Sequence, residues 1–430
     1  MFNLKIILLF SLLIITTTSI LVEGQPVAEE CTLVEDLSTH PTLKITLTTK
    51  PFDEGSFGKI FRTERGDKVI KRVELKDQDM VIPLLGEIKA MEALSGVVGM
   101  VGLDKDEGCY YNGEHVYLIM PFFQADIAKF LTSKSNKTGY AVAHSYVWKL
   151  YASNYIVNLV VHLHSMNWLH LDLKIDNILI EDIFSLYLTD FGFASQVDPV
   201  SEEDQYPYIE KDIASGTLQF AAPEIFSTYK YYRETDIYAL AVVLLQIWYI
   251  RDVNTYQYLD KPINVKMQFL SCKNKTFNKN DISMLMFCTF IYPVITKMYR
   301  TNLEDRIIGN KLLESFKQAM INAINYLNEQ VAAINQMIEQ NPNDNIESLA
   351  NSKNKRDINS FIEAFVGMKA KNMNENQPLK EFMLKTNAVF FEARADKGAG
   401  ILGFTIDDYV NAVIDPNTPI QIPEEERLII

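Results

Sequence analysis

Cysteine is scarce in this chain, and basic residues do not outnumber acidic ones. The 430 residues include 4 cysteines, and 41 Lys and Arg stand against 55 Asp and Glu, which gives a formal net charge of −14. Nonspecific nucleic-acid binding depends on clustered lysine and arginine, so this balance argues against nucleic acid as a partner. With 48% hydrophobic and 22% charged residues, the composition is that of a globular protein with one large domain and an extension.

Long uncharged runs are also few. Tyr238–Ile250 is too short to cross a bilayer, which takes about 20 apolar residues, so we expect a buried helix there. The run Ile6–Val22 follows Lys5 and precedes a small residue, Gly24, which is the pattern of a signal peptide over residues 1–24. The alternative is an uncleaved anchor that keeps the rest of the chain lumenal or extracellular. Either way the sequence predicts a protein of the secretory pathway or a secreted one, with a membrane partner only if the segment stays uncleaved.

Cysteine pairing and glycosylation would both fit that route. The cysteines are Cys31, Cys109, Cys272 and Cys288. Four cysteines allow three fully paired connectivities, and one of these joins the first two and the last two, of which the second pair is local. The sequence does not choose among them, and free buried thiols remain an alternative. Residues 136–138 and 274–276 are Asn-X-Thr sequons, which carry weight only together with the leader.

The most informative stretch is His170–Asn177, which reads HLDLKIDN and is followed 13 residues later by Asp190-Phe191-Gly192. Phosphoryl transfer from a nucleotide needs a carboxylate at the attacking hydroxyl, divalent metal held by oxygen ligands, and positive charge on the phosphates. The side chains that can supply these are Asp172, Lys174, Asn177 and Asp190. The stretch resembles the catalytic loop and the metal-binding loop of the eukaryotic protein kinase superfamily.

The other motifs of that family follow in the expected order over roughly residues 45–320. Residues 54–61 resemble its glycine-rich loop, residues 69–71 the strand with its phosphate-binding lysine, and residues 216–224 the end of its activation segment. Glu87 and Arg306 stand where the family keeps a glutamate that pairs with that lysine and an arginine that pairs with Glu224, and Asp236-Ile237-Tyr238 opens a buried helix. A single short motif would be weak, but this ordered set is strong.

The resemblance implies catalytic roles for four residues. Lys71 would contact the α- and β-phosphates of ATP, with Glu87 holding its ammonium group; a solvated surface pair is the alternative. Asp172 would accept the proton of the substrate hydroxyl, and Lys174 would neutralise the transferring phosphoryl group. The alternative for this cluster is an inactive fold that retains the residues.

The resemblance also implies where the cofactors bind. Asn177 and Asp190 would hold Mg²⁺ or Mn²⁺ through oxygen atoms. The remaining nucleotide-binding residues would be Gly55, Ser56, Phe57, Gly58, Met120, Phe123 and Asp126. Met120 would guard the back of the adenine pocket, with core packing as the other reading, Phe123 would supply a backbone donor, and Asp126 would meet a ribose hydroxyl. Asp53 occupies the first glycine position of the family, so nucleotide affinity is expected to be lower or more dependent on metal.

Two positions bear on substrate and regulation. At Lys174 and Thr217 the sequence resembles the serine/threonine kinases of the family. Thr217 would help to position the substrate. Leu171 replaces an arginine that normally binds a phosphate on the activation segment, and that segment, Asp190–Glu224, is acidic. We therefore predict activity without activation-segment phosphorylation. His162 and His164, on the helix before the catalytic loop, are expected to be structural.

The predicted architecture is α+β with two lobes, like the protein kinase fold. After an acidic leader, residues 25–44, β-rich patterns over 45–122 predict a small antiparallel sheet interrupted by one helix near Val81–Leu94. Helical patterns dominate residues 126–320, including Tyr146–Met166 before the catalytic loop.

A C-terminal extension, residues 321–430, follows the kinase-like part. Apolar spacing over Lys311–Glu339 predicts a long amphipathic helix leading into it. The extension is expected to be a helical tail packed on the large lobe, with a regulatory or partner-binding module as the alternative.

The first functional hypothesis is an ATP-dependent serine/threonine protein kinase with protein substrates that is secreted or acts in the secretory pathway. The second is a secreted pseudokinase that acts as a binding or scaffold module. A small-molecule kinase is disfavoured because Gly216–Glu224 resembles the peptide-positioning end of protein kinases. The sequence predicts no particular oligomeric state.

Overall fold

The computed structural model describes residues 31–33, 50–51, 53–55, 58–63, 65–75, 81–133, 146–182, 185–197, 207–211, 216–250, 252–259, 261–275 and 282–340. The predicted signal peptide, nearly all of the leader, the sequon at 136–138 and the extension beyond 340 lie outside these residues. The chain divides into two compact units, which we describe separately. Unit 1 runs to Phe123 and includes Thr189–Ser195, and unit 2 comprises Gln124–Leu188 and the chain from Gln196 onward.

Unit 1 is built on a six-stranded sheet in the order β1-β5-β6-β4-β3-β2. Its strands are β1 (Thr32–Leu33), β2 (Asp53–Gly55), β3 (Gly58–Arg62), β4 (Lys68–Glu74), β5 (Cys109–Tyr111) and β6 (His115–Pro121). Helix α3 (Val81–Ala93) lies between β4 and β5 in sequence. It buries Leu84, Ile88 and Met91, which recur at helical spacing. A core of Phe61, Ile70, Tyr110, Tyr117 and Ile119 lies on the sheet.

The edge strand β1 departs from the predicted antiparallel pattern. β2 to β6 pair antiparallel, whereas β1 pairs parallel with β5, with Thr32 opposite Tyr110. A disulfide joins Cys31, just before β1, to Cys109, the first residue of β5. Parallel strands have no tight turn to connect them, so the strand pairing and this covalent link together tie the distant N-terminal segment to the sheet.

Unit 2 is mainly helical. Its helices are α4 (Ile127–Thr132), α6 (Tyr146–Ser165), α7 (Ile225–Thr228), α8 (Arg233–Tyr249), α9 (Val253–Leu259), α10 (Pro262–Lys273), α11 (Ile282–Met286), the π-helix η5 (Phe287–Ile291), α12 (Tyr292–Met298) and α13 (Gly309–Gln340), with short 3₁₀ turns η3 (Ile175–Asn177), η4 (Leu218–Phe220) and η6 (Leu303–Asp305). Its strands are β7 (Ala125–Asp126), β8 (Trp168–Leu169), β9 (Ile178–Asp182), β10 (Ser185–Leu188), β12 (Ile209–Glu210) and β13 (Lys230–Tyr231), and β11 (Ser195–Gln196) falls where the two units meet in sequence.

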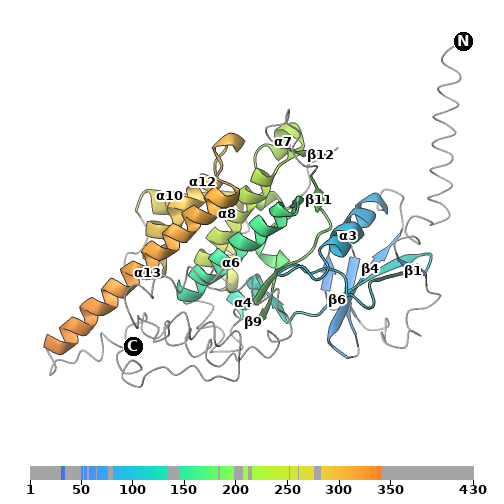
Figure 1. Ribbon diagram of the computed structural model, residues 1–430, viewed down its shortest axis with the longest axis horizontal. Helices are drawn as coiled ribbons and strands as arrows, with labels where there is room; N and C mark the ends of the chain where they lie inside the picture. Colours follow the sequence, from blue (N-terminus) through green and yellow to red (C-terminus); the bar gives the residue numbers. More distant parts are fainter. Residues whose placement is uncertain are drawn as a thin grey trace, which may run out of the picture. The chain divides into compact units, whose positions relative to one another are not determined.

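The apolar run near Tyr238 forms the buried helix α8, as predicted. α6 packs against α8 and α13, and the three helices run side by side in Figure 1. α13 buries Leu312, Phe316 and Met320, one face of the predicted amphipathic helix. Within the described residues, no helix combines the length and apolar character needed to cross a membrane.

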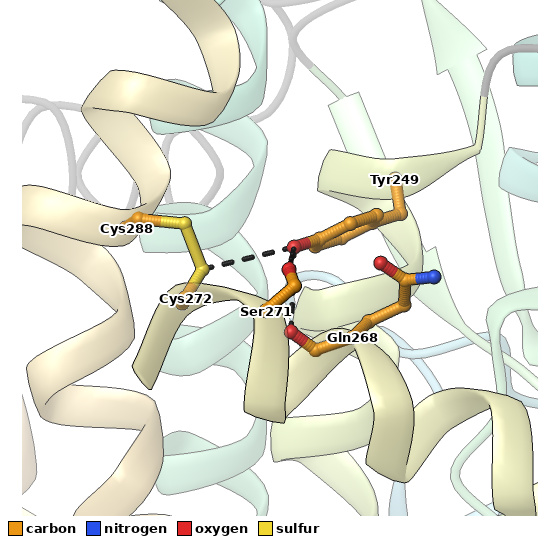
Figure 2. The surroundings of a disulfide bond; sticks show 5 residues. All are labelled: Tyr249, Gln268, Ser271, Cys272 and Cys288. Atoms are coloured by element: carbon orange, nitrogen blue, oxygen red, sulfur yellow. Dashed lines mark hydrogen bonds between the residues drawn. A yellow bond between two sulfur atoms is a disulfide. The ribbon is translucent and has the colours of Figure 1, made fainter. Parts of the chain in front are cut away.

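A second disulfide joins Cys272 on α10 to Cys288 on η5. Figure 2 shows the Tyr249 hydroxyl beside it, 2.9 Å from Ser271 Oγ and 3.7 Å from Cys272 Sγ. Of the connectivities that the sequence allows, the structure therefore has the one that joins the first two and the last two cysteines, and the alternative of free thiols is wrong. Since Tyr249 ends α8, this cluster links α8, α10 and η5 within the helical core.

The predicted fold class is confirmed: in the described residues, a small, largely antiparallel sheet with helix α3 is followed in sequence by a mainly helical part. The helices predicted at 81–94, 146–166 and 311–339 are α3, α6 and α13.

Candidate active site

Lys71 lies on β4, between β3 and β6 in the sheet of unit 1. Its Nζ is 2.5 Å from Glu87 Oε1 on α3 and 3.6 Å from Asp190 Oδ1. Lys71 is 8% exposed and Glu87 3%, so the alternative of a solvated surface pair is wrong. The three residues, distant in sequence, are brought together within unit 1.

The charge of Lys71 is set by these neighbours. Burial alone would lower its pKa, but the Glu87 and Asp190 carboxylates outweigh this and raise the pKa above its ordinary value. Lys71 therefore keeps its positive charge at neutral pH, which is the property that a phosphate-binding lysine needs.

Gly58 begins β3, where the chain turns back from β2, and pairs with Gly55. Its φ is +149°, and a Cβ there would lie 2.6 Å from the Arg72 carbonyl oxygen, so only glycine fits. Asp53 pairs with Ile60 in the same hairpin. The predicted nucleotide-binding residues Ser56 and Phe57 lie outside the described residues.

The predicted adenine-binding residues stand at the end of the same sheet. Met120 is the penultimate residue of β6, opposite Val69, and is buried. Phe123 follows the strand and ends this part of unit 1. Asp126, in unit 2, caps α4: its Oδ1 accepts the Lys129 N–H at 2.7 Å, and its Oδ2 lies 3.1 Å from Lys129 Nζ. These residues keep their nucleotide roles as predictions, and Asp126 has a structural role as well.

Asp172 is the centre of the site in unit 2. Its Oδ1 accepts hydrogen bonds from the Thr217 backbone N–H at 2.9 Å and the Thr217 hydroxyl at 2.7 Å. Its Oδ2 accepts from Lys174 Nζ at 2.8 Å and Asn177 Nδ2 at 3.2 Å. Two donors on each oxygen fix the orientation of this buried carboxylate, with a lysine cation directly beside it.

Gly216 brings Thr217 to this position. Its φ is +103°, and a Cβ would meet the Leu171 carbonyl oxygen at 2.9 Å. Thr217 directly precedes the turn η4, whose Phe220 is buried. The close approach of two backbones requires glycine at 216.

The catalytic loop itself is held by Asp236, in the first turn of α8. Asp236 Oδ2 accepts the His170 N–H at 2.8 Å and lies 2.9 Å from His164 Nε2, and Oδ1 accepts the Leu171 N–H at 2.9 Å. Burial by itself would raise the pKa of Asp236, but His164 and the loop hold that pKa below its ordinary value. The loop needs this support because Leu171 adopts φ +64°, a strained value for a side chain with a Cβ.

Arg306 pairs with Glu224, as the family resemblance implies. Arg306 Nη1 and Nη2 donate to the two carboxylate oxygens at 2.6 and 2.7 Å, and the Thr235 hydroxyl donates to Oε1 at 3.0 Å. This bidentate pair joins the end of the activation segment to Arg306, directly after η6, and the Thr235 hydrogen bond joins it to the start of α8.

Sequence reasoning missed two contacts of the catalytic loop. It noted Asp236 only as the start of a buried helix; an acidic residue at the head of an otherwise apolar run was the available signal, because a buried carboxylate must find donors. The second is Asp176, whose Oδ1 accepts the Tyr256 hydroxyl of α9 at 2.6 Å. Nothing in the local sequence pattern predicts the contact between Asp176 and Tyr256.

The residues present fit a nucleotide and a hard divalent cation. Asn177 makes its bonds to Asp172 through Nδ2, so its Oδ1 takes no part in them. The Asp190 side chain is 35% exposed, and Lys71 lies near its Oδ1. Carboxylate and amide oxygens are the ligands that Mg²⁺ prefers, and the glycine hairpin and Lys71 suit a phosphate chain.

Comparisons with known proteins agree with this geometry. The family model described as "Protein kinase domain" matches residues 49–316, more than half of the chain. The L-type lectin-domain containing receptor kinase VIII.1 of Arabidopsis thaliana is 28% identical over 235 residues, covering 51% of this chain and 30% of the relative.

Two further relatives give a similar result. A serine/threonine-protein kinase of Yarrowia lipolytica is 27% identical over 216 residues, 46% of this chain and 30% of the relative. The cAMP-dependent protein kinase catalytic subunit of Arthrobotrys oligospora is 28% identical over 140 residues, 33% of this chain and 24% of the relative. The matches span less than a third of the length of these curated relatives. The fold and the family match over more than half of the chain lead to one conclusion: the chain belongs to the protein kinase family.

Proposed function

We propose that the protein is an ATP- and Mg²⁺-dependent serine/threonine protein kinase that acts in the secretory pathway or outside the cell. The observation that carries the proposal is the Asp172 carboxylate, fixed by four donors with Lys174 beside it. A fixed carboxylate at a substrate hydroxyl can accept its proton, which contributes about 10²–10⁴-fold to such reactions.

Each unit has a share of the chemistry. In unit 1, Lys71, held by Glu87, binds phosphate oxygens of ATP and keeps them in place. In unit 2, Asp172 takes the proton of the attacking hydroxyl, and Lys174 stabilises negative charge on the transferred group. When bound by Asn177 and Asp190, Mg²⁺ supplies charge neutralisation on the phosphates.

The preference for serine and threonine rests on Thr217 and Lys174. Thr217 sits against Asp172 and gives this carboxylate two of its four donors. The relatives from Yarrowia lipolytica and Arthrobotrys oligospora are named as a serine/threonine-protein kinase and a cAMP-dependent protein kinase, which supports the same preference.

Entry into the secretory pathway is supported by cysteine use. All four cysteines of the chain are paired in disulfides. Disulfides persist mainly in oxidising compartments, and the apolar run Ile6–Val22 has the form of a signal peptide. Asn274, exposed at the end of α10, begins the second sequon.

The test of the activity uses full-length protein produced through a secretory route. The protein is incubated with γ-labelled ATP, Mg²⁺ or Mn²⁺ and a generic basic acceptor protein, and the labelled amino acid is identified after hydrolysis. We expect phosphoserine or phosphothreonine, and no label with Lys71→Met. Phosphotyrosine would overturn the serine/threonine assignment. Absence of both transfer and ATP-induced thermal stabilisation would favour a pseudokinase.

The test of routing is separate. Secreted protein from eukaryotic cells is expected to begin after residue 24 by mass spectrometry, and Asn274→Gln is expected to remove one glycosidase-sensitive mass increment. Retention of the full chain in the cytosol would contradict the proposed localisation.

A further inference from the structure

Residues 209–211 of the activation segment pair with the short strand that precedes α8. Strand β12 pairs antiparallel with β13, with Ile209 opposite Tyr231 and Glu210 opposite Lys230. The Lys211 N–H extends this ladder by donating to the Tyr229 carbonyl oxygen at 3.1 Å. β12 lies beside α7 in Figure 1, because β13 follows that helix directly.

Side chains clamp both faces of this short ladder. On one face, the Lys230 ammonium lies 3.9 Å from the centre of the Tyr208 ring, and that ring lies 5.7 Å from the Tyr232 ring. On the other face, Lys211 Nζ lies 5.5 Å from the centre of the fully buried Tyr231 ring. Successive residues of a strand point to opposite faces, so Tyr208 and Lys211 grip the partner strand from two sides.

Lys211 also interacts electrostatically with Asp236, the residue that holds the catalytic loop. Burial lowers the pKa of Lys211 to about 8, and the Asp236 carboxylate opposes that decrease. Asp236 is the residue that holds the backbone N–H groups of His170 and Leu171. A cation from the activation segment thus interacts electrostatically with the carboxylate that holds the catalytic loop.

A second anchor lies a few residues further on. Gly216 packs against the Leu171 carbonyl, and Thr217 donates two hydrogen bonds to Asp172. The clamp at 208–211 and this contact flank only residues 212–215. Fixing residues 208–211 therefore restricts the positions that Gly216 and Thr217 can adopt.

We propose that Lys211 and Tyr208 are positioning residues: together with Lys230 and Tyr231 they clamp the activation segment so that Thr217 reaches Asp172 without a phosphate on the segment. This inference rests on the proposed kinase function. It concerns how Thr217 is held against Asp172 in that site. Leu171 carries no charge, so it offers no cation to a phosphate at that place in the loop. Lys211 supplies a positive charge from the segment itself.

The test compares wild type, Lys211→Met, Lys211→Arg and Tyr208→Leu, all treated with phosphatase. Tyr258→Leu is the matched control, because Tyr208 and Tyr258 are 39% and 45% exposed and Tyr258 lies on α9, outside the clamp. We expect Lys211→Met and Tyr208→Leu to lower kcat by about 10- to 100-fold, as small displacements of catalytic groups do. The KM for ATP is expected to stay within about twofold, and Lys211→Arg to keep most of the activity.

Deuterium uptake of the peptide that contains Thr217 gives a readout independent of catalysis. Uptake should rise in Lys211→Met and Tyr208→Leu, but not in Lys211→Arg or Tyr258→Leu. Unchanged uptake in the first two variants, or an unchanged kcat beside an active wild type, would overturn the clamp. An inactive wild type whose uptake still responds to Lys211→Met would support the clamp and reject the kinase function.

Discussion

Thr217 donates two hydrogen bonds to one oxygen of Asp172, from its hydroxyl at 2.7 Å and its backbone N–H at 2.9 Å. The other oxygen of Asp172 is bound by Lys174 and Asn177. The carboxylate is thus held from its own loop and from a segment 45 residues away. The end of the activation segment and the catalytic loop therefore both hydrogen-bond to the Asp172 carboxylate.

The Thr217 hydroxyl should matter more than its methyl group. Thr217→Val keeps the shape but removes one of the four donors to Asp172, so we expect kcat to fall by about tenfold or more with protein substrates. Thr217→Ser keeps the hydroxyl and should retain most of the activity. Steady-state kinetics of the two variants check this, and equal activities would mean that the hydroxyl bond has no role.

The buried pair of Lys71 and Glu87 should show strong coupling in stability. Lys71→Met leaves the Glu87 carboxylate buried with its main partner removed, which costs about 3–5 kcal/mol in comparable sites. The double variant Lys71→Met/Glu87→Leu removes both charges and should recover much of that loss, while remaining inactive. Urea unfolding of the two single variants and the double variant gives the coupling energy. Additive effects would contradict the buried pair.

The two disulfides should contribute unequally to stability. In the chain-entropy description a closed loop of 16 residues, as for Cys272–Cys288, is worth about 3 kcal/mol, and one of 78 residues, as for Cys31–Cys109, about 4.5 kcal/mol. Paired Cys→Ser substitutions, followed by unfolding in denaturant, measure each contribution. Peptide mapping without reduction should recover these two pairs, and any other connectivity would reject the described arrangement.

Because of Lys211, the stability of the folded protein should vary with pH in the alkaline range. Its pKa in the folded protein is lowered to about 8 by burial, against an ordinary value of 10.5. Between these values the unfolded chain binds more protons, so this lysine makes the folded state more stable as pH rises. Below pH 8 the buried charge carries its full desolvation cost, so the stability of wild type relative to Lys211→Met should be lowest there. The Asp236 carboxylate acts on the charge of this ammonium, and the centre of the Tyr231 ring lies 5.5 Å from it.

The stability of wild type relative to Lys211→Met should increase as pH rises from about 8 to 10.5 and level off above that range. Lys297→Met, at an exposed lysine on α12, serves as the control and should show no such trend. Thermal melts across this range provide the measurement. A constant difference between Lys211→Met and wild type would show that Lys211 does not titrate there.

The sequence predicted those parts of the site that short motifs encode. Asp172, Lys174 and Asn177 occur within six residues of one another, and their spacing alone brought them to one loop. The pairing of Lys71 with Glu87 was expected from the family resemblance, and the structure places both with Asp190 in unit 1.

Contacts between distant segments were not predictable in the same way. Asp236 binds His164, His170 and Leu171, and nothing in the periodicity of α8 shows which donors a buried carboxylate will find. The strands β12 and β13 have two residues each, too few for an alternating pattern. The parallel pairing of β1 likewise joins segments distant in sequence, beside a disulfide that the sequence did not choose among the possible connectivities.

The most direct test of the proposed mechanism is phosphate transfer by Asp172→Asn beside wild type and Asp106→Asn, a matched change at an acidic residue in a surface turn. Asparagine keeps the shape of Asp172 but cannot accept the proton, so kcat should fall by about 10²–10⁴-fold. ATP should stabilise all three proteins against heat to the same extent, and Asp106→Asn should match wild type. Transfer by Asp172→Asn at the wild-type rate would contradict the assignment of Asp172 and, with it, the proposed mechanism.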